Sequence, residues 1–431
     1  MHFLIEKNYY RNMEFKEHLK SYLSDQEINS LVSSLQGESK HAVLLNLSKM
    51  SDETFLSLFP NVQKHPIVPH AYLYDKNEYQ LGKSIYHDLG CFYLQEPSAM
   101  VPAYLLGAEE HDLILDLCAA PGGKTMQTSF KMNGTGLIIS NDLSRNRCNA
   151  IVDNAERLGL GNIVVTNNDF AKIYKKYLNT FSRIILDAPC SGSGMFRKES
   201  KMEEDWSYNK VIKFAETQKE LILIAYAMLK EGGTMCYSTC SFSKEEDEGV
   251  IEYLLENTDA QIEKVENPLF YVNKDKPLGV HLFPHIFPGE GHYICLIKKP
   301  GILSKSQSKE EKMEKYNLPF KYVFKFGDYL FGSNFKCKTD DLNIVRLGVR
   351  VGKLIKDEIK YDYHYSHYVK EMRKYELNDE QLKLYFKGET IPACLDKGYY
   401  LLTYQNINVD IAKNDGRIFK NHLPKYLRKT I

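Results

Sequence analysis

A long apolar run is absent from the sequence. The longest uninterrupted apolar stretch, Leu221–Leu229, is much shorter than the roughly 20 residues that a membrane-spanning helix needs. The first ten residues mix polar and apolar side chains and lack the basic flank and apolar core of a secretory signal. We therefore expect a cytoplasmic protein that has no membrane partner.

A regular cysteine pattern is also absent. The nine cysteines have neither the spacing of a disulfide framework nor a CxxC pair or Cys/His cluster suited to zinc. In a reducing compartment, such cysteines are either buried or act as nucleophiles. We predict no metal site, and we expect Cys118, Cys148, Cys236 and Cys295 to be buried and unreactive.

Net charge is the third feature that is missing, because 56 Lys and Arg balance 56 Asp and Glu. The distribution is nevertheless uneven. Residues 301–431 contain 25 basic and 17 acidic residues, so their balance is 25 − 17 = +8, and residues 1–300 carry 31 − 39 = −8. A basic C-terminal part on an acidic body is typical of a protein that binds a polyanion. Ordinary variation of surface charge explains the pattern equally well.

The patterns that are present predict an α/β protein of two or three domains, since 431 residues exceed one ordinary domain. The Ser-, Lys- and Glu-rich segment 301–315 is expected to be a linker. Before it, five apolar runs alternate with candidate helices at Arg145–Leu158 and Lys210–Leu229. The alternation predicts a mostly parallel, doubly wound sheet with helices on both faces. The runs are residues 113–117, 137–142, 162–169, 183–189 and 232–240.

Two further predictions concern helices. The first hundred residues are expected to form a separate, mainly helical module. The helix after the fifth run is expected to begin just past Cys240, at the capping-box pattern Ser243-Lys244-Glu245-Glu246.

Chemically suggestive residues follow the ends of the runs, which is where ligands bind in an open parallel sheet. The first run leads into a loop whose glycines allow a close approach of a ligand and whose lysine places a cation at the start of a helix. This loop is Cys118, Ala119, Ala120, Pro121, Gly122, Gly123 and Lys124. It is neither GxGxxG nor a P-loop, which argues against a dinucleotide oxidoreductase and an NTPase.

Two aspartates follow the next two runs. Asp142 comes about 20 residues after the glycine loop, where a carboxylate would hold a ribose diol, and Asp169 would meet the adenine end of the same ligand. Acidic residues also end many strands in ordinary turns, and for either aspartate alone that explanation is the more frequent one.

Cysteines follow the last two runs. The fourth run ends in Asp187, Pro189 and Cys190 before a glycine-rich loop, and the fifth ends at Cys240. Two cysteines that leave neighbouring strand ends beside a carboxylate form a candidate nucleophilic site. Burial without reactivity is nevertheless the commonest fate of cysteine.

In order and spacing, these motifs resemble those of the Nop/Sun family of RNA cytosine-5 methyltransferases. The matching segments are LDLCAAPGGKT (115–125), Asn141-Asp142, Asn168-Asp169, LDAPCSGSGMFRK (186–198), YSTCS (237–241) and, as the closing motif, residues 281–293. The resemblance implies a Rossmann-like S-adenosylmethionine-dependent methyltransferase domain.

The flanks resemble a bacterial branch of that family whose members act on 16S ribosomal RNA. The resemblance implies an N-terminal RNA-binding module at 1–96, a catalytic domain at 97–300 and, after an intermediate segment at 316–372, a PUA-like RNA-binding domain at 373–431. The residues that carry the last match are 385–390 and 420–428. The tyrosine-rich stretch Tyr361–Tyr368 could stack on bases, but its spacing suits a packed helix equally well.

The resemblance also implies a reaction, in which a methyl group passes from S-adenosylmethionine to C5 of a cytidine in RNA. Cys240 would add to C6 of the base, Cys190 would promote release of the product, and Asp187 with Lys124 would stabilise charge on the base. The loop 118–124, Asp142, Asp169 and Asp187 would bind the cofactor. The expected partner is 16S ribosomal RNA or the small ribosomal subunit, and we expect a monomer. Transfer RNA or another ribosomal RNA as substrate, and an inactive ribosome-assembly factor, stay open as alternatives.

Overall fold

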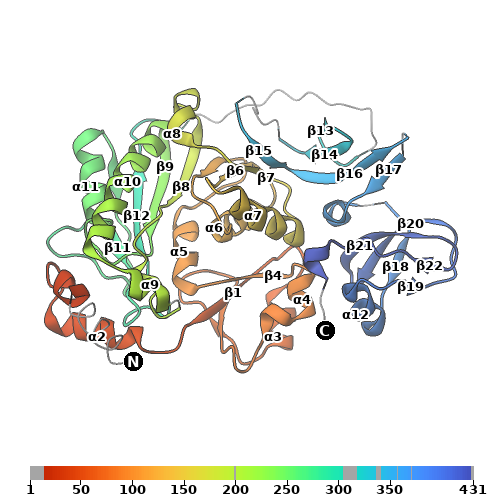
Figure 1. Cartoon of the computed structure of the whole chain (residues 1–431), viewed down its shortest axis with the longest axis horizontal. Coiled ribbons are helices and arrows are strands. Elements are labelled where there is room, and N and C mark those ends of the chain that lie inside the picture. Colours follow the sequence, from red (N-terminus) through yellow and green to blue (C-terminus); the bar gives the residue numbers. More distant parts are fainter. Residues whose placement is uncertain are drawn as a thin grey trace.

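The computed structural model describes residues 14–198, 200–303, 318–335, 341–356, 358–369 and 371–428. From residue 304 on, the predicted linker 301–315 lies outside the described residues. The largest sheet occupies one side of the elongated molecule, and two smaller sheets from the C-terminal part occupy the other (Figure 1). None of the helices in the described ranges is long and apolar enough to cross a membrane.

A nine-stranded sheet forms the centre of the structure. Its order is β10-β12-β9-β8-β5-β6-β7-β15, with β11 paired to β12. The five predicted runs correspond to the five strands that pair in parallel, which confirms the doubly wound sheet. These are β5 (Leu113–Asp116), β6 (Leu137–Asn141), β7 (Ile163–Thr166), β8 (Phe181–Asp187) and β9 (Leu229–Thr239). Antiparallel partners flank them: β10 (Gln261–Glu263), β11 (Val280–His281), β12 (Tyr293–Lys298) and β15 (Ile344–Leu347).

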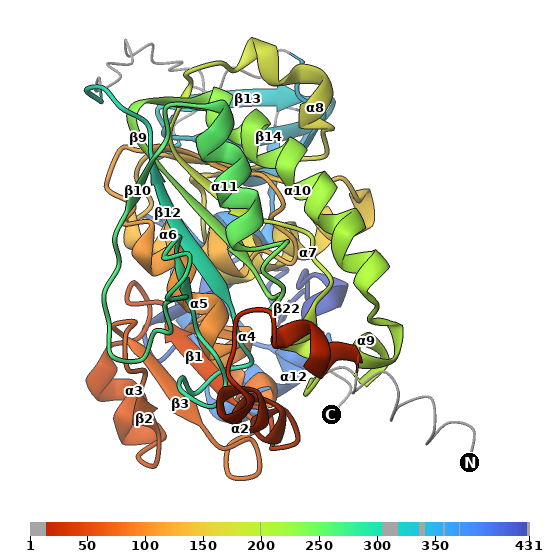
Figure 2. The same ribbon diagram turned by 90° about the vertical axis from the view of Figure 1, so that its left-hand side faces the viewer.

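Helices cover both faces of this sheet, which explains why its strands are apolar throughout. Alternate residues of one strand point to opposite faces: Leu115 packs in the cluster of α10 and α11, whereas Ile114 packs in the cluster of α6 and α7. Figure 2 shows α10 and α11 side by side over the strands. The predicted helices are confirmed as α7 (Arg145–Leu158) and α10 (Tyr208–Met228). The others are α5 (Pro97–Leu105), α6 (Gly123–Lys131), α8 (Phe170–Ile173), α9 (Ser200–Asp205) and α11 (Glu248–Asn257).

The helix after β9 does not begin where its capping-box pattern predicted. It begins at Glu248, and residues 244–247 form turns. The carboxylate of Glu246 accepts hydrogen bonds from Ser191 and Ser241 instead of capping a helix. The prediction is wrong because the Glu246 side chain forms hydrogen bonds with the distant loop at Ser191.

The N-terminal module contains the predicted helices and, in addition, an antiparallel sheet that was not predicted. Its order is β2-β3-β1-β4. The central strand β1 is buried on both faces: Ala42 and Leu44 pack toward α5, and Val43 and Leu45 pack toward the C-terminal part. Such a strand has no apolar–polar alternation to reveal it. The elements are α2 (Asp25–Leu35), β1 (His41–Leu45), α3 (Asp52–Leu58), β2 (Gln63–Lys64), β3 (Ala71–Tyr74), α4 (Ile85–Asp88) and β4 (Phe92–Gln95).

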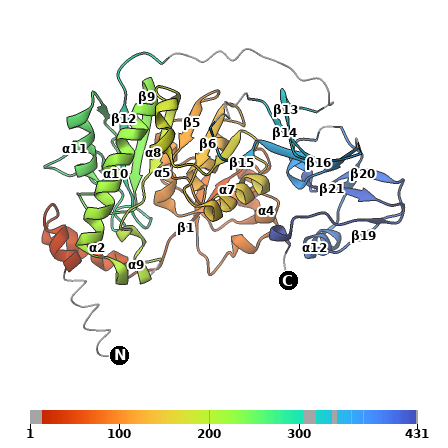
Figure 3. The same cartoon turned by 45° about the horizontal axis from the view of Figure 1, so that its top comes forward.

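The C-terminal part folds into two sheets, and one of its strands joins the nine-stranded sheet. Strand β15 leaves the intermediate segment and pairs antiparallel with β7 (Figure 3). The first sheet is β13 (Tyr322–Phe326), β14 (Tyr329–Ser333), β16 (Val349–Ile355) and β17 (Glu358–Tyr361). The second comprises β18 (Lys374–Glu376), β19 (Ile391–Pro392), β20 (Gly398–Tyr404), β21 (Ile407–Asn414) and β22 (Ile418–Phe419), with α12 (Asp379–Lys387) beside it.

The tyrosine-rich stretch is packed rather than open. It forms a short 3-10 helix, η4 (Tyr363–His367), in which Tyr363 and Tyr365 are buried. Tyr368 donates a hydrogen bond to the carbonyl of Gly159 at the end of α7. Because the rings of Tyr363 and Tyr365 are buried in the folded chain, they are not available to stack on bases.

Candidate active site

The carboxyl ends of β5, β8 and β9 bring the predicted catalytic residues together. The Lys124 ammonium, at the start of α6, donates a 2.8 Å hydrogen bond to Oδ2 of Asp187 at the end of β8. Ser238 of β9 donates to Oδ1 of the same carboxylate at 2.7 Å. The Lys124 side chain is 7% exposed and that of Asp187 is 34% exposed. The carboxylate is therefore the more accessible of the two groups, and the ammonium is buried.

Both members of this pair stay charged. Burial alone would raise the pKa of Asp187, but the Lys124 ammonium holds it well below its ordinary value. Burial alone would lower the pKa of Lys124, and Asp187 raises it above its ordinary value. The site therefore presents a fixed carboxylate and ammonium to whatever binds in front of them.

The two cysteines that follow β8 and β9 are in contact. The Sγ atoms of Cys190 and Cys240 lie 3.1 Å apart, and both side chains are free and partly exposed. The hydrogen bond to Cys240, together with burial, raises the pKa of Cys190 well above its ordinary value. Cys190 is therefore a thiol near neutral pH, able to donate its proton toward the Cys240 sulfur.

A buried carboxylate, which the sequence predicted only as part of a helix cap, holds the two cysteine loops together. Glu246 accepts hydrogen bonds from the backbone N–H of Ser191 at 2.8 Å, from the Ser241 hydroxyl at 2.7 Å and from Gln218 at 3.1 Å. The Ser191 hydroxyl also donates to it. Ser191 follows Cys190 and Ser241 follows Cys240, so the separation of the two sulfur atoms depends on this carboxylate.

We expect Glu246→Ala to lower the free energy of unfolding by about 3 kcal/mol, because buried donors on two loops and on α10 lose their acceptor. Urea denaturation measures the change. The matched control is Glu256→Ala on the exposed face of α11, which should shift stability by less than about 0.5 kcal/mol. Equal stabilities of the two variants would contradict the role given to Glu246.

The predicted cofactor loop lies beside this site. The Ala120–Pro121 peptide bond is cis, and Gly122 has φ +104°, a conformation that favours glycine. Asp142 is buried and accepts hydrogen bonds from the backbone N–H of Ala120 at 3.3 Å and of Ser144 at 2.8 Å. These hydrogen bonds join the loop to the end of β6.

Asp169 is placed differently from the other predicted site residues. Its side chain caps α8 through the N–H of Ala171 and forms a 3.0 Å ion pair with Lys172, in an exposed position. No contact that we find among the described residues joins it to Asp142 or Asp187. Its part in ligand binding stays a prediction.

The expectation of buried cysteines holds for three of the four. Cys148, Cys236 and Cys295 are at most 1% exposed. Cys118 is partly exposed, because it lies in the loop beyond the end of β5 rather than in the strand.

Asp116, the last residue of β5, was also not identified as a site residue. It is 1% exposed, and only its Oδ2 atom has a partner, the Thr125 hydroxyl at 2.6 Å. Its Oδ1 atom is buried without a hydrogen bond in the described structure. Burial raises the pKa of Asp116 to about 7. A cationic ligand at the strand end would give this oxygen a partner.

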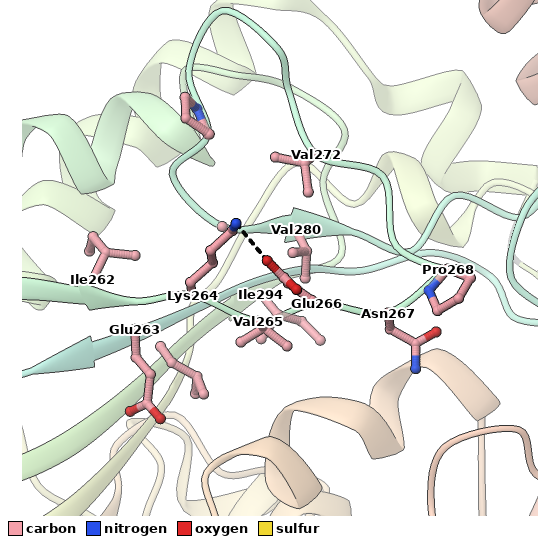
Figure 4. Close-up of a pocket in the computed structure, with 13 residues that line it drawn as sticks. Ile262, Glu263, Lys264, Val265, Glu266, Asn267, Pro268, Val272, Val280 and Ile294 are labelled. Atoms are coloured by element: carbon pink, nitrogen blue, oxygen red, sulfur yellow. Dashed lines mark ion pairs between the residues drawn. The ribbon is translucent and has the colours of Figure 1, made fainter.

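Two other features lie apart from the strand-end site. A surface hollow of about 780 Å³ opens between the edge strand β10 and the loop before β11, and its rim carries an ion pair of Lys264 with Glu266 (Figure 4). In the described ranges, one group of side chains has metal-ligand spacing, namely Asp247, Glu248 and His281. It is fully buried, and a 2.9 Å hydrogen bond between His281 and Glu248 already joins two of its members.

The chain resembles known proteins over most of its length. Ribosomal RNA small subunit methyltransferase F of Shewanella oneidensis is 30% identical over 439 residues, which cover 90% of this chain and 91% of the relative. The same enzyme of Shewanella piezotolerans is 28% identical over 433 residues, with 90% and 91% coverage. This chain belongs to the ribosomal RNA small subunit methyltransferase F family. It is thus an RNA methyltransferase, and the family resemblance predicted from its motifs is confirmed.

Family descriptions match three consecutive parts of this methyltransferase F chain. Residues 12–97 match the N-terminal domain of 16S rRNA methyltransferase RsmF, and residues 103–298 match 16S rRNA methyltransferase RsmB/F. Residues 372–429 match the RsmF methyltransferase PUA domain. The predicted Rossmann-like methyltransferase domain with an RNA-binding PUA domain is confirmed.

Solved structures share the fold of the methyltransferase F chain. NSun6 from Pyrococcus horikoshii, solved with SFG, has a TM-score of 0.61 at 21% identity and covers 67% of this chain and 98% of its own. A methyltransferase homolog from the same organism has a TM-score of 0.59 at 24% identity, with 66% and 93% coverage. At these identities the likeness concerns the fold alone.

Proposed function

We propose that this RNA methyltransferase moves a methyl group from S-adenosylmethionine to C5 of a cytidine, through a covalent bond between Cys240 and C6 of the base. The observation that carries the proposal is the contact of two free cysteines, 3.1 Å apart, beside the charged pair of Lys124 and Asp187. A carboxylate, an ammonium and two sulfur atoms at one opening suit covalent catalysis on a pyrimidine.

The need for a thiolate follows from the chemistry of cytosine, whose C5 is a poor nucleophile in the aromatic ring. When the Cys240 thiolate adds to C6, the ring loses its aromaticity and C5 gains electron density. Charge then develops on the base near N3 and the exocyclic groups. Asp187, which is partly exposed, lies where it can accept hydrogen bonds from the base, and Lys124 balances the negative charge.

The second half of the reaction removes the C5 proton and breaks the S–C6 bond. Cys190 is the second sulfur at the opening, next to Cys240. We assign it to this release step. The C5 proton passes to water, the electrons of the C5–H bond restore the ring double bond, and the Cys240 thiolate leaves, so that the methylated base is released and the free enzyme is regenerated.

The residues at the end of β5 fit S-adenosylmethionine. The buried Oδ1 of Asp116 lacks a partner in the described structure, and the cofactor carries cationic ammonium and sulfonium groups. Asp142 lies at the glycine loop, where a carboxylate can hold a ribose diol. When bound, the cofactor supplies an electrophilic methyl group. The chain holds the cofactor with Asp116, the loop 118–124 and Asp142.

We expect the affinity for S-adenosylmethionine to fall as the pH drops below about 7. Burial raises the pKa of Asp116 to about 7, so below that pH the carboxyl takes up a proton and loses its attraction for a cation. Asp116→Asn should weaken binding by roughly 10- to 100-fold and remove much of this pH dependence. Calorimetric titration at pH 6 and 8 measures both, with the exposed Asp275→Asn as control. Wild-type affinity that is equal at both pH values would contradict the assignment.

The proposed substrate is 16S ribosomal RNA, because the relatives that span this chain are small-subunit methyltransferases. Bisulfite sequencing of total RNA, with the gene intact, deleted or replaced by a Cys240→Ala copy, tests this proposal. One or more protected 16S cytidines should lose protection in the last two strains. Loss in transfer RNA or another ribosomal RNA would support the alternative substrate, and no loss in any RNA would support the inactive assembly factor. A cytoplasmic location, a monomeric state and the absence of a metal stay predictions.

A further inference from the structure

The closing motif places a histidine against the catalytic ion pair. His292 lies just before β12. Its Nε2 atom lies 3.4 Å from the Lys124 ammonium and 3.7 Å from Oδ1 of Asp187. Its side chain is 6% exposed, against 34% for Asp187, so it is less accessible than the carboxylate. His292 therefore acts on the substrate only through Lys124 and Asp187.

The surroundings of the other ring nitrogen determine the tautomer. Nδ1 lies 2.8 Å from the carbonyl of Gly291, which can only accept a hydrogen bond. It also lies 3.4 Å from the Ser98 hydroxyl, whose proton is directed to Glu96 at 2.6 Å. Both oxygens are acceptors toward Nδ1, so Nδ1 carries the proton. In the neutral ring, Nε2 then presents a lone pair to Lys124.

The scaffold behind His292 fixes the ring in this orientation. The Ser98 hydroxyl accepts a 3.0 Å hydrogen bond from the N–H of Gly291, and Glu96 accepts one of 2.6 Å from the N–H of Glu290. Glu96 and Ser98 lie at the start of α5, at the junction of the N-terminal module and the catalytic domain. The junction thus sets the position of the histidine.

The geometry points to a role for His292: we propose that its neutral ring is a positioning residue that accepts a hydrogen bond from Lys124 and keeps the ammonium on Asp187. A protonated ring would have no lone pair for Lys124 and would place a second positive charge beside it. It would also compete for Asp187. The charged groups that face the ring are Lys124 from α6, Asp187 from β8 and Glu96 from α5.

Two substitutions with a control test the kinetic part, which rests on the proposed cytosine methylation. His292→Phe keeps a ring without an acceptor and should lower kcat roughly 10- to 100-fold, with KM for S-adenosylmethionine within about twofold. His292→Gln restores an acceptor for Lys124, so it should recover most of kcat. The control is His285→Phe, in the same closing segment, which should behave as the wild type.

A second measurement needs no activity. Nitrogen-15 NMR of the histidine-labelled protein, with His292 assigned by its loss in His292→Phe, should show the neutral Nδ1–H tautomer near neutral pH. An Nε2–H tautomer would overturn the proposal, whether or not the protein methylates cytidine. If the wild type is active, the proposal would also be overturned by a His292→Phe variant that keeps the wild-type kcat, or by His292→Phe and His292→Gln variants that lower kcat equally. If the wild type methylates no RNA, the proposed function fails. The NMR measurement of the His292 tautomer would still test the proposed hydrogen bond to Lys124.

Discussion

Cys240→Ala is expected to lower methyl transfer to RNA by on the order of 10⁴-fold or more, to the background of the assay. Loss of a covalent nucleophile removes the whole adduct route, which has no substitute at the site. The fold should be unaffected, because the side chain is partly exposed and lies in a loop held by other groups. Transfer of a labelled methyl group to small-subunit RNA measures the effect.

The loop around Cys240 is held without its sulfur. The Cys240 carbonyl accepts a 2.7 Å hydrogen bond from the N–H of Gly194, and the N–H of Phe242 donates to the Ser193 hydroxyl at 2.7 Å. An inactive Cys240→Ala protein with wild-type stability would thus be inactive for chemical reasons. Cys394→Ala, which removes an exposed cysteine of the C-terminal part, is the matched control and should be fully active. A Cys240→Ala protein that retained even a tenth of the wild-type rate would refute the nucleophile assignment.

Cys190→Ala is expected to trap the enzyme on its RNA. Addition and methyl transfer depend on Cys240, whereas release depends on the neighbouring thiol 3.1 Å away. Removing a group that assists proton transfer should slow turnover by roughly 10²- to 10⁴-fold and leave the adduct to accumulate. A band of reduced mobility on a denaturing gel, which carries both protein and labelled RNA, measures it.

The double variant Cys190→Ala/Cys240→Ala is the control for this trap, since it retains the Cys190→Ala pocket but lacks the attacking sulfur. It should give no such band. If Cys190→Ala turned over at the wild-type rate, or if the band persisted in the double variant, the separation of roles between the two sulfurs would be wrong.

The catalytic sheet was predictable because its strands are buried on both faces and alternate with amphipathic helices. The same rule failed for β1, which is also buried on both faces. It belongs to a small antiparallel sheet, and the segments that pack on its two faces are distant in the sequence. Where a helix starts depends on single side chains. The capping-box pattern at Ser243 failed because the Glu246 carboxylate accepts a hydrogen bond from Ser191, 55 residues earlier in the chain.

The contact of Cys190, Cys240, Asp187 and Lys124 followed from the rule that ligands bind beyond parallel strand ends, combined with the family motifs. Glu246 and His292 were missed because their partners lie far away in the sequence. His292 meets Lys124 across 168 residues and Ser98 across 194. Asp116 was missed for another reason, since a carboxylate that ends an apolar strand is inconspicuous until its unpaired oxygen is seen.

The pairing of β15 with β7 determines how the parts of the chain can be studied. A segment after residue 340 completes the catalytic sheet, and one apolar cluster is shared by Val43 and Phe92 of the N-terminal module and Tyr385 and Leu402 of the C-terminal part. Cutting the chain between its modules would leave β7 as an open edge and uncover both sides of that cluster. We therefore expect the modules to unfold together, so that RNA binding has to be separated from catalysis by point substitutions instead of truncations.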